Sequence, residues 1–442
     1  MISPKKIRSE EDYIFNERAE VGVGGNLRWV KRIGSAFPAL QNKNYKLYFY
    51  GQLISLIGTW LQIVAQGWLV LQLTNSAFLV GLVAAVALLP ALLFSLFGGV
   101  IVDQFSKKHI LLVSQSCAMA LAIVLGILTL TGNITVWGIG TIAFLLGTVN
   151  AIDNPARQAF VPEIVSSEQL PSAIALNSGA FNAARVIGPS IAGVLIAIVG
   201  TGGAFIFNGL SYLAVLTALL AMKVAPFTKP VRKNALKAIK EGISYSISHP
   251  IIRVLISITG VVSIFGWSYM TIMPVIARNQ FGLDATGLGY LYAASGLGSL
   301  IATFIVGGYA KKIPPVWFIF GGNSLFAISI ILFSYTSSLL IALPLLFLVG
   351  MGLLSQAAMM NTIIQSLVRK ELRGRVMSIY ILMFLGLSPI GNFQIGWLSE
   401  NISIGFALRL GAVIVFLFGL LVFYYRKRIR ESYKLYKKNN RI

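Results

Sequence analysis

The chain has 442 residues, of which 56% are hydrophobic and only 11% are charged. Soluble domains contain about 25% charged residues, so a soluble fold of this chain would leave large apolar surfaces in water. This excludes a cytosolic enzyme and a secreted domain. The composition predicts an all-α integral membrane protein, with lipid around most of its surface.

The chain is strongly basic, with 36 Lys and Arg residues against 14 Asp and Glu residues and a net charge of +22. Such a charge can indicate nucleic-acid binding, but these cations lie between apolar runs and form no stripe with stacking aromatic residues. The expected partners are therefore membrane lipids with anionic headgroups, and not nucleic acid. The one cysteine, Cys117, lies within an apolar run and cannot form an intramolecular disulfide.

Residues 1–44 form a polar segment of mixed charge. They contain no short apolar region followed by a small-residue cleavage site, so we expect no secretory signal peptide. We expect this segment to be a cytoplasmic N-terminal tail.

Twelve apolar runs follow, and each approaches the length of about 20 residues that crosses a roughly 30 Å hydrocarbon core. They extend over residues 45–73, 78–102, 110–130, 136–151, 170–199, 204–222, 251–276, 288–309, 316–334, 339–367, 376–397 and 405–425. The runs predict twelve transmembrane helices in two six-helix halves, residues 45–223 and 251–426, with a central loop at 224–250 and a basic cytoplasmic tail at 427–442. This is the layout of a transporter whose halves are related by an axis along the membrane normal, with the substrate path between them.

Basic residues divide the turns into two groups. The turns after the even-numbered runs each carry several Lys or Arg, except the turn at 153–169, which has only Arg157. The turns after the odd-numbered runs contain only Arg278. Because basic loops face the cytoplasm, both termini are predicted to be cytoplasmic.

The central loop contains a helical pattern of apolar and basic residues. The apolar positions Leu236, Ile239, Ile243 and Ile247 oppose the charged positions Lys233, Lys237, Lys240 and Glu241. This pattern predicts an amphipathic helix on the inner leaflet of the membrane.

The residues that usually carry catalysis or bind metal are scarce. The two histidines lie in or beside turns, and with one cysteine they offer no metal cluster, so we expect no metal, no cofactor and no enzyme activity. All 14 acidic residues fall at or beyond the ends of the runs. The sequence thus predicts no carboxylate deep in the membrane, where the proton carrier of a secondary transporter usually lies.

Polar side chains repeat along one face of the first run at steps of three and four: Gln52, Ser55, Thr59, Gln62 and Gln66. Such a face must point toward protein or water. Hydrogen bonds between helices and an amide-lined transport cavity explain it equally well. Further candidates for the same cavity are Asn150, Asn182, Trp267, Thr271, Gln356 and Met359.

Two arginines lie within runs, where an unpaired charge is costly. Arg409 is near the outer end of the twelfth run and can reach outward to the interface. Arg185 is in the middle of the fifth run, near the neutral residues Asn177, Asn182 and Asn208. An anionic group of the substrate could be its counter-charge, which adds Arg185 to the candidate cavity. Alternatively, Arg185 forms hydrogen bonds with backbone carbonyls in a water-filled cleft.

The turn between the second and third runs reads Gly99-x3-Asp103-x2-Ser106-Lys107-Lys108. It resembles the most specific signature of the major facilitator superfamily, with Ser106 in place of a usual Gly and Lys107 in place of Arg. The fifth run, around Gly188-Pro189, is similar to the superfamily's antiporter motif, with alanines at three usual glycine positions.

Longer segments resemble one branch of this superfamily, which holds the enterobactin exporter and macrolide-type efflux pumps. They lie at 51–60, 67–74, 153–163, 185–189 and 241–250. The resemblance implies a bacterial inner-membrane exporter of amphiphilic small molecules (drug, macrolide or siderophore type) that works by alternating access and is driven by the proton gradient. A monomer is expected. The alternatives are a lysophospholipid or lipid flippase, which needs a lateral opening between helices, and a non-transporting membrane receptor.

The resemblance also implies a gate built from Gly99, Asp103, Lys107, Lys108, Asp153, Arg157, Gly188 and Pro189. Asp103 is expected to face the N-terminus of the eleventh helix near Val376, a dipole interaction of about 0.3 to 1 kcal/mol when exposed. Lys107 is expected to bridge Asp103 and Asp153, and this network would latch the cytoplasmic side in the outward-open state. In that case Asp153 is a gate residue and not the proton carrier. The sequence leaves three mechanisms of coupling open. Either a gate acid such as Asp153 titrates, or the substrate or water carries the proton, or transport is not coupled to an ion.

Overall fold

The computed structural model describes residues 37–224, 235–310 and 312–439, and in these ranges the regular elements are all helical. The N-terminal half contains η1 (Pro38–Gln41), α2 (Lys43–Thr74), α3 (Ala77–Gln104), α4 (Lys107–Leu130), α5 (Val136–Ile164) and α6 (Leu170–Ala221). The predicted N-terminal tail up to residue 36, and Lys233 of the central loop, lie outside the described residues.

The C-terminal half begins with α7 (Ala235–Ser248) and α8 (Pro250–Val261), followed by the short turns η2 (Val262–Gly266), η3 (Trp267–Met270), α9 (Met273–Val275) and η4 (Ile276–Gln280). It continues with α10 (Ala285–Tyr309), α11 (Pro315–Phe333), α12 (Leu339–Leu367), α13 (Lys370–Ile381), η5 (Leu382–Gly386), α14 (Ser388–Asn401), α15 (Ile404–Tyr424) and α16 (Arg426–Asn439).

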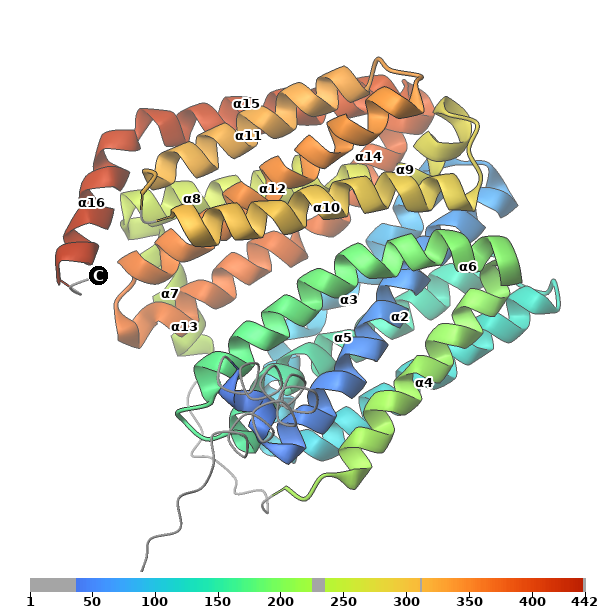
Figure 1. The fold of residues 1–442 in the computed structure, drawn as a ribbon, viewed down its shortest axis with the longest axis horizontal. Coiled ribbons are helices and arrows are strands. Elements are labelled where there is room, and N and C mark those ends of the chain that lie inside the picture. Colours follow the sequence, from blue (N-terminus) through green and yellow to red (C-terminus); the bar gives the residue numbers. More distant parts are fainter. Residues whose placement is uncertain (1–36, 225–234, 311, 440–442) are drawn as a thin grey trace, which may run out of the picture.

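Among the described residues, 11 helical segments are long and apolar enough to cross a membrane. One of them, α6, has 52 residues, which at 1.5 Å per residue would extend about 78 Å, more than twice the bilayer core. It is instead folded back at Gly200, whose φ of 70° and ψ of 177° are not helical, as Figure 1 shows where the chain reverses beside the α6 label. The two arms of α6 bring the number of crossings to twelve, and the predicted all-α membrane fold is confirmed.

The first residues of several helices explain where the crossings begin. A side-chain oxygen accepts a hydrogen bond from a backbone N–H of the first turn, which satisfies a donor that has no partner within the helix. The capping residues are Asn42 for α2, Ser76 for α3, Thr135 for α5, Asp284 for α10 and Ser403 for α15.

One predicted turn is wrong. The sequence predicts a turn at 153–169, but residues 153–164 continue α5 to Ile164, and only residues 165–169 separate α5 from α6. Charged residues together with Pro155 and Pro162 suggested a break. The helix tolerates both prolines, because backbone groups freed by proline inside a bundle find other partners. Asp153 is consequently buried inside the half, with 0% of its surface exposed.

The seventh and eleventh crossings are interrupted. Each contains a π-helical turn, at Val262–Gly266 and at Leu382–Gly386, and in the seventh crossing a 3-10 turn follows at Trp267–Met270. Such turns often lie at functional positions of membrane helices. In the seventh crossing, Trp267 is the first residue of the 3-10 turn.

The amphipathic helix predicted in the central loop is present as α7, which packs against α13. Glu241 forms an ion pair with Arg375 of α13, and Gly242 allows the close contact with the same residue. Ile243 and Ile247 remain exposed on the other side of the helix.

The two halves approach each other at one end of the molecule. We call the end at which α2 begins and α15 ends the terminal end, and the end with the turns at Asn75 and Ile402 the far end. At the far end a Cβ added to Gly81 of α3 would lie 2.5 Å from the backbone oxygen of Asn392 of α14, and one added to Gly193 of α6 would lie 2.7 Å from that of Ala285. Figure 1 shows the bundles converging there and diverging toward the terminal end.

Candidate functional site

The polar face of α2 points into the N-terminal half. Gln62 is buried, and its side-chain oxygen accepts a hydrogen bond from the amide of Asn208 on the second arm of α6. Gln52 and Ser55 are buried as well, whereas Thr59 donates to the backbone oxygen of Ser55 in its own helix. Gln66 is half-buried. The sequence predicted either hydrogen bonds between helices or a cavity wall for this face. For Gln62, the structure shows a hydrogen bond between helices.

Two candidates of the C-terminal half are fully buried on α12. Gln356 has 0% exposure and packs against Gly322 of α11, and neither of its side-chain polar atoms forms a hydrogen bond within the described residues. Met359 also has 0% exposure and belongs to the hydrophobic core. The structure does not bring these two residues together with the polar face of α2.

The structure does bring two other candidates together across the halves. Arg185 lies midway along the first arm of α6, and its guanidinium carbon is 5.0 Å from the centre of the Trp267 ring. Both side chains line a narrow cavity with Tyr269, Met270, Tyr292, Ser295, Gly296 and Ser299. A cation over the face of an indole is attracted by its π electrons, so this contact links the N-terminal half to the seventh crossing.

The remaining cavity candidates are not among the residues that line this cavity. Asn182 is half-buried and donates to the backbone oxygen of Ser178, 2.8 Å away in the same helix. Asn150 is half-buried on α5. Thr271 donates to the side-chain oxygen of Asn392 at 2.8 Å. Arg409 reaches the far end as expected, where it lies over the ring of Tyr335 and donates to Ser334.

Sequence reasoning missed the hydroxyl groups of this cavity. Tyr292, Ser295 and Ser299 are three and four residues apart and lie along one face of α10. The helical spacing of these polar residues was a signal comparable to that of the first run. Tyr269, two residues after Trp267, had no such pattern.

A buried ion cluster occupies the part of the N-terminal half nearer the terminal end. Asp153 forms an ion pair with Arg157, one helical turn later, and accepts hydrogen bonds from Ser114 at 2.5 Å and Gln115 at 2.8 Å. Three donors compensate the desolvation of this carboxylate. Asp153 therefore lies within α5 and not in a turn, and its carboxylate is buried in the protein.

The basic residues of the gate signature have other partners than expected. Lys107 forms an ion pair with Glu163 at 3.2 Å, where the sequence predicted a bridge between Asp103 and Asp153. The extension of α5 explains the change, because it carries Glu163 to the end of the half where Lys107 begins α4. Lys108 donates to the backbone oxygen of Met222 at 2.7 Å and thereby satisfies a carbonyl at the C-terminus of α6.

The other gate residues lie on α3 and α6. Gly99 belongs to α3. Asp103, at the end of α3, is exposed and forms no hydrogen bond or ion pair with any described residue. Gly188 allows α6 to approach α2, because a Cβ there would lie 2.5 Å from the Cβ of Trp60, and the adjacent Pro189 is buried.

A carboxylate joins the two halves at the far end. Glu400, at the end of α14, accepts hydrogen bonds from the backbone nitrogens of Ala77 at 2.7 Å and Phe78 at 3.4 Å. These nitrogens are the first of α3, so a negative charge meets the positive end of a helix dipole. No pattern in the sequence distinguishes Glu400 from other charged residues at the span ends.

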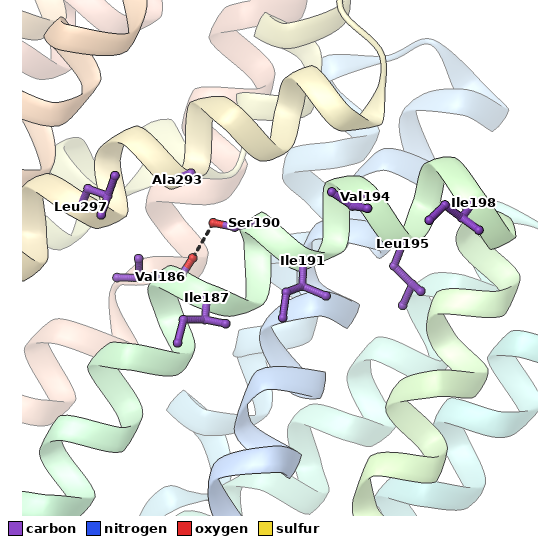
Figure 2. A pocket seen from close by; sticks show the side chains of 9 residues that line it. All are labelled: Val186, Ile187, Ser190, Ile191, Val194, Leu195, Ile198, Ala293 and Leu297. Atoms are coloured by element: carbon purple, nitrogen blue, oxygen red, sulfur yellow. Dashed lines mark hydrogen bonds between the residues drawn. The ribbon is translucent and has the colours of Figure 1, made fainter.

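An apolar groove lies between α6 and α10, and its walls are shown in Figure 2. Its volume is about 470 Å³, and it is lined by Val186, Ile187, Ser190, Ile191, Val194, Leu195, Ile198, Ala293 and Leu297. The hydroxyl of Ser190 donates to the backbone oxygen of Val186, as the dashed line in Figure 2 marks, so no free polar group faces the groove from this residue. Ile198 is 74% exposed, and the groove opens on the outer surface of the protein.

Comparison with known proteins relates these features to a family. The sequence profile described as "Transmembrane secretion effector" matches residues 34–440. The chain belongs to this family. It is thereby a transporter of the major facilitator superfamily, as the resemblance of the gate signature implied.

Curated relatives of this family member are transporters. The chain is 27% identical to the staphyloferrin A transporter of Staphylococcus aureus over 78% of this chain and 87% of the relative. It is 25% identical to the multidrug efflux pump Tap of Mycolicibacterium fortuitum, over 84% and 95%. It is 22% identical to the enterobactin exporter EntS of Escherichia coli, over 88% and 94%. These relatives are transporters and not enzymes.

A solved structure shares the fold of this family member. A bacterial homologue of the human lysosomal transporter Spinster matches with a TM-score of 0.65 and 13% identity, over 90% of this chain and 98% of that chain. This likeness agrees with a multi-pass membrane protein of the major facilitator fold.

Proposed function

We propose that the protein exports amphiphilic small molecules of the siderophore or drug type across the bacterial inner membrane, as a monomer, by alternating access coupled to proton entry. The observation that carries this proposal is the contact between Arg185 and Trp267, at mid-depth between two halves that pack closely at the far end. A cargo site between two rocking halves is the arrangement of such transporters. The names of the three relatives support siderophores and drugs as the cargo.

The orientation follows from the basic residues. Lys107, Lys108 and Lys223 lie at the terminal end, together with the basic helix α16. The positive-inside rule assigns this end, and both termini, to the cytoplasm. With the far end closed, cargo reaches the site from the cytoplasm, which is the loading state of an exporter.

Two carboxylates are proposed to hold the two ends in turn. Glu400 meets the N-terminus of α3 in the present state. The second and eleventh crossings run in opposite directions, so Asp103 at the end of α3 can meet the N-terminus of α13 when the terminal end closes. Each latch is an interaction between a carboxylate and a helix N-terminus. This interaction can break and form while the carboxylate stays in contact with water.

Asp153 is the proposed proton site. It is the fully buried carboxylate of the N-terminal half, and its partners Arg157, Ser114 and Gln115 come from α4 and α5. Protonation would remove the ion pair with Arg157, which lies on the same helix, and would weaken the hydrogen bonds that Ser114 and Gln115 of α4 donate to the carboxylate. This couples the charge of Asp153 to the packing of the half that carries Arg185.

The groove between α6 and α10 favours a second candidate function, a lysophospholipid or lipid flippase. It is apolar and open to the outer surface, and its first residue Val186 follows Arg185 in the chain. An acyl chain could lie in this groove while a polar headgroup reaches the space between the halves.

The test is transport into inverted membrane vesicles that contain the full-length protein. The panel contains a citrate-type carboxylate siderophore, a catecholate siderophore, a macrolide, a lipophilic cation and a fluorescent lysophospholipid, each with and without a protonophore. Protonophore-sensitive uptake of a siderophore or drug supports the proposed function. Movement of the lysophospholipid alone supports the flippase, and binding of a panel member without any uptake identifies a receptor.

A further inference from the structure

Arg185 is a cation whose hydrogen-bond donors are not used by the protein. A guanidinium carries five N–H donors and no acceptor. Within the described residues Arg185 forms no hydrogen bond and no ion pair. Its guanidinium instead makes a cation–π contact with Trp267. The indole N–H of Trp267 is itself buried without a hydrogen-bond partner.

The groups around these donors do not supply an acceptor of matching charge. The residues lining the cavity include no Asp or Glu. The hydroxyls of Tyr269 and Ser295 bond to each other at 2.7 Å, that of Tyr292 donates to the backbone oxygen of Met270, and that of Ser299 to Gly350. The cavity thus has unused donors and a positive charge, and its acceptors are largely engaged.

A guanidinium at mid-depth in a membrane protein is costly to leave unpaired, and the half-buried Arg185 faces the space between the halves, where water or a group of the substrate can bind it. Oxyanions are the groups that guanidinium binds best, often through two parallel hydrogen bonds. We infer that Arg185 and Trp267 form the recognition site for an oxyanion of the substrate, and that the cargo is an amphiphilic organic anion. This inference rests on the proposed function and specifies its substrate class.

The site is built for one group of the substrate. The free volume of the narrow cavity is about 10 Å³, close to the smallest space that holds one water. One oxygen of a carboxylate, catecholate or phosphate fits there, while the remainder of the cargo stays outside this cavity. A lipophilic cation is disfavoured, because it would meet Arg185 with no carboxylate in the lining.

The bound anion also has a mechanical consequence. Arg185 belongs to the N-terminal half and Trp267 to the C-terminal half, so an oxyanion that bonds to both draws the halves together. A ligand with more favourable contacts in the closed state shifts the population toward that state. An anionic cargo would therefore favour the arrangement of the halves in which both donors reach its oxygen.

The experiment measures binding to the purified full-length protein by equilibrium dialysis. The probes are a citrate-type carboxylate siderophore, lysophosphatidylglycerol and tetraphenylphosphonium, and the variants are Arg185→Gln, Arg185→Lys and Trp267→Phe. Arg409→Gln is the matched control, since Arg409 is also an intramembrane arginine but contacts Ser334 and Tyr335 at the far end.

We expect Arg185→Gln to weaken binding of an anionic probe at least tenfold, Arg185→Lys to weaken it less, and Arg409→Gln to leave it unchanged. Trp267→Phe retains the aromatic ring and removes the N–H, and should weaken binding severalfold even if Arg185→Gln fails to fold. Preference for the siderophore or for the lysophospholipid identifies the source of the oxyanion. Anion binding unchanged in Arg185→Gln, or wild-type binding that is tighter for tetraphenylphosphonium than for either anion, would overturn the inference.

The vesicle assay separates this inference from the proposed function. Arginine-dependent anion binding without any transport by the wild-type protein would leave the site intact and contradict the exporter. Export of a macrolide or cation at equal rates by wild type and Arg185→Gln would leave the exporter intact and contradict the anion site.

Discussion

The side-chain oxygen Oε2 of Glu400 lies 2.7 Å from the backbone nitrogen of Ala77. This hydrogen bond joins the end of the eleventh crossing to the start of the second and therefore crosses between the halves. The close contacts at Gly81 and Gly193 lie at the same end. Charge and packing together close the far end in this state.

Glu400→Gln should weaken this closure. The amide keeps a hydrogen-bond acceptor but loses the charge that interacts with the helix dipole, an effect of about 0.3 to 1 kcal/mol and up to a fivefold shift in the equilibrium. Spin labels on the two halves at the far end, at Asn133 and Thr336 in a Cys117→Ser background, should show a larger population of long distances. Asp284→Asn is the control, because Asn retains the cap of α10 and Asp284 accepts from its own half. Equal distance distributions in Glu400→Gln and wild type would exclude the latch.

Asp103→Asn should slow transport without lowering stability of the present state. Asp103 is exposed and has no partner among the described residues, so its charge is not used here and is needed only when the terminal end closes. Vesicle uptake should fall severalfold while the amount of protein in the membrane and its melting temperature stay unchanged. A melting temperature several degrees lower would instead assign Asp103 a structural role in the present state.

The sequence predicted the twelve crossings well because lipid requires about 20 apolar residues for each of them, and this demand is local. It failed at Asp153, where a charge and two prolines looked like a turn. Ser114 and Gln115, which donate hydrogen bonds to this carboxylate, belong to another helix. The residues next to Asp153 in the sequence do not predict these partners.

The candidate site was predictable in residue type and not in pairing. Arg185 and Trp267 are candidates because polar or charged groups are costly in lipid unless they contact protein, water or substrate. Their mutual contact depends on how the two halves pack. For the same reason the sequence did not decide whether Gln62 lines a cavity or bonds to Asn208. Glu400 looked like an ordinary charge at a span end, since its partner is a backbone on the other half.

His249 should make stability depend on pH. It caps α8, where its Nδ1 accepts a long hydrogen bond from the backbone nitrogen of Ile252, and burial lowers its pKa below the usual 6.5. Folding thus favours the neutral ring, so its stabilising contribution is complete above pH 6.5 and is lost as the pH falls through the lower folded pKa. The variant His249→Asn retains a capping oxygen that does not titrate. The melting temperature of wild type relative to this variant should fall between pH 7.5 and pH 5, and a constant difference would contradict the role of His249.

Asp153→Asn and Arg157→Gln should each strongly destabilise the protein, because each leaves one buried partner of an ion pair unmatched, at a cost of about 3 to 5 kcal/mol. The double variant should lose less than the sum of the two, since neither charge then remains buried alone. Thermal melting of the detergent-solubilised variants measures this coupling, with Lys107→Gln as the control for the separate pair with Glu163. A transport assay distinguishes a structural role of Asp153 from a role in proton transport. If Asp153 carries the proton, the double variant that regains stability should still lose protonophore-sensitive uptake. Full protonophore sensitivity in the stable double variant would assign the proton to another carrier and leave the Asp153–Arg157 pair a packing role.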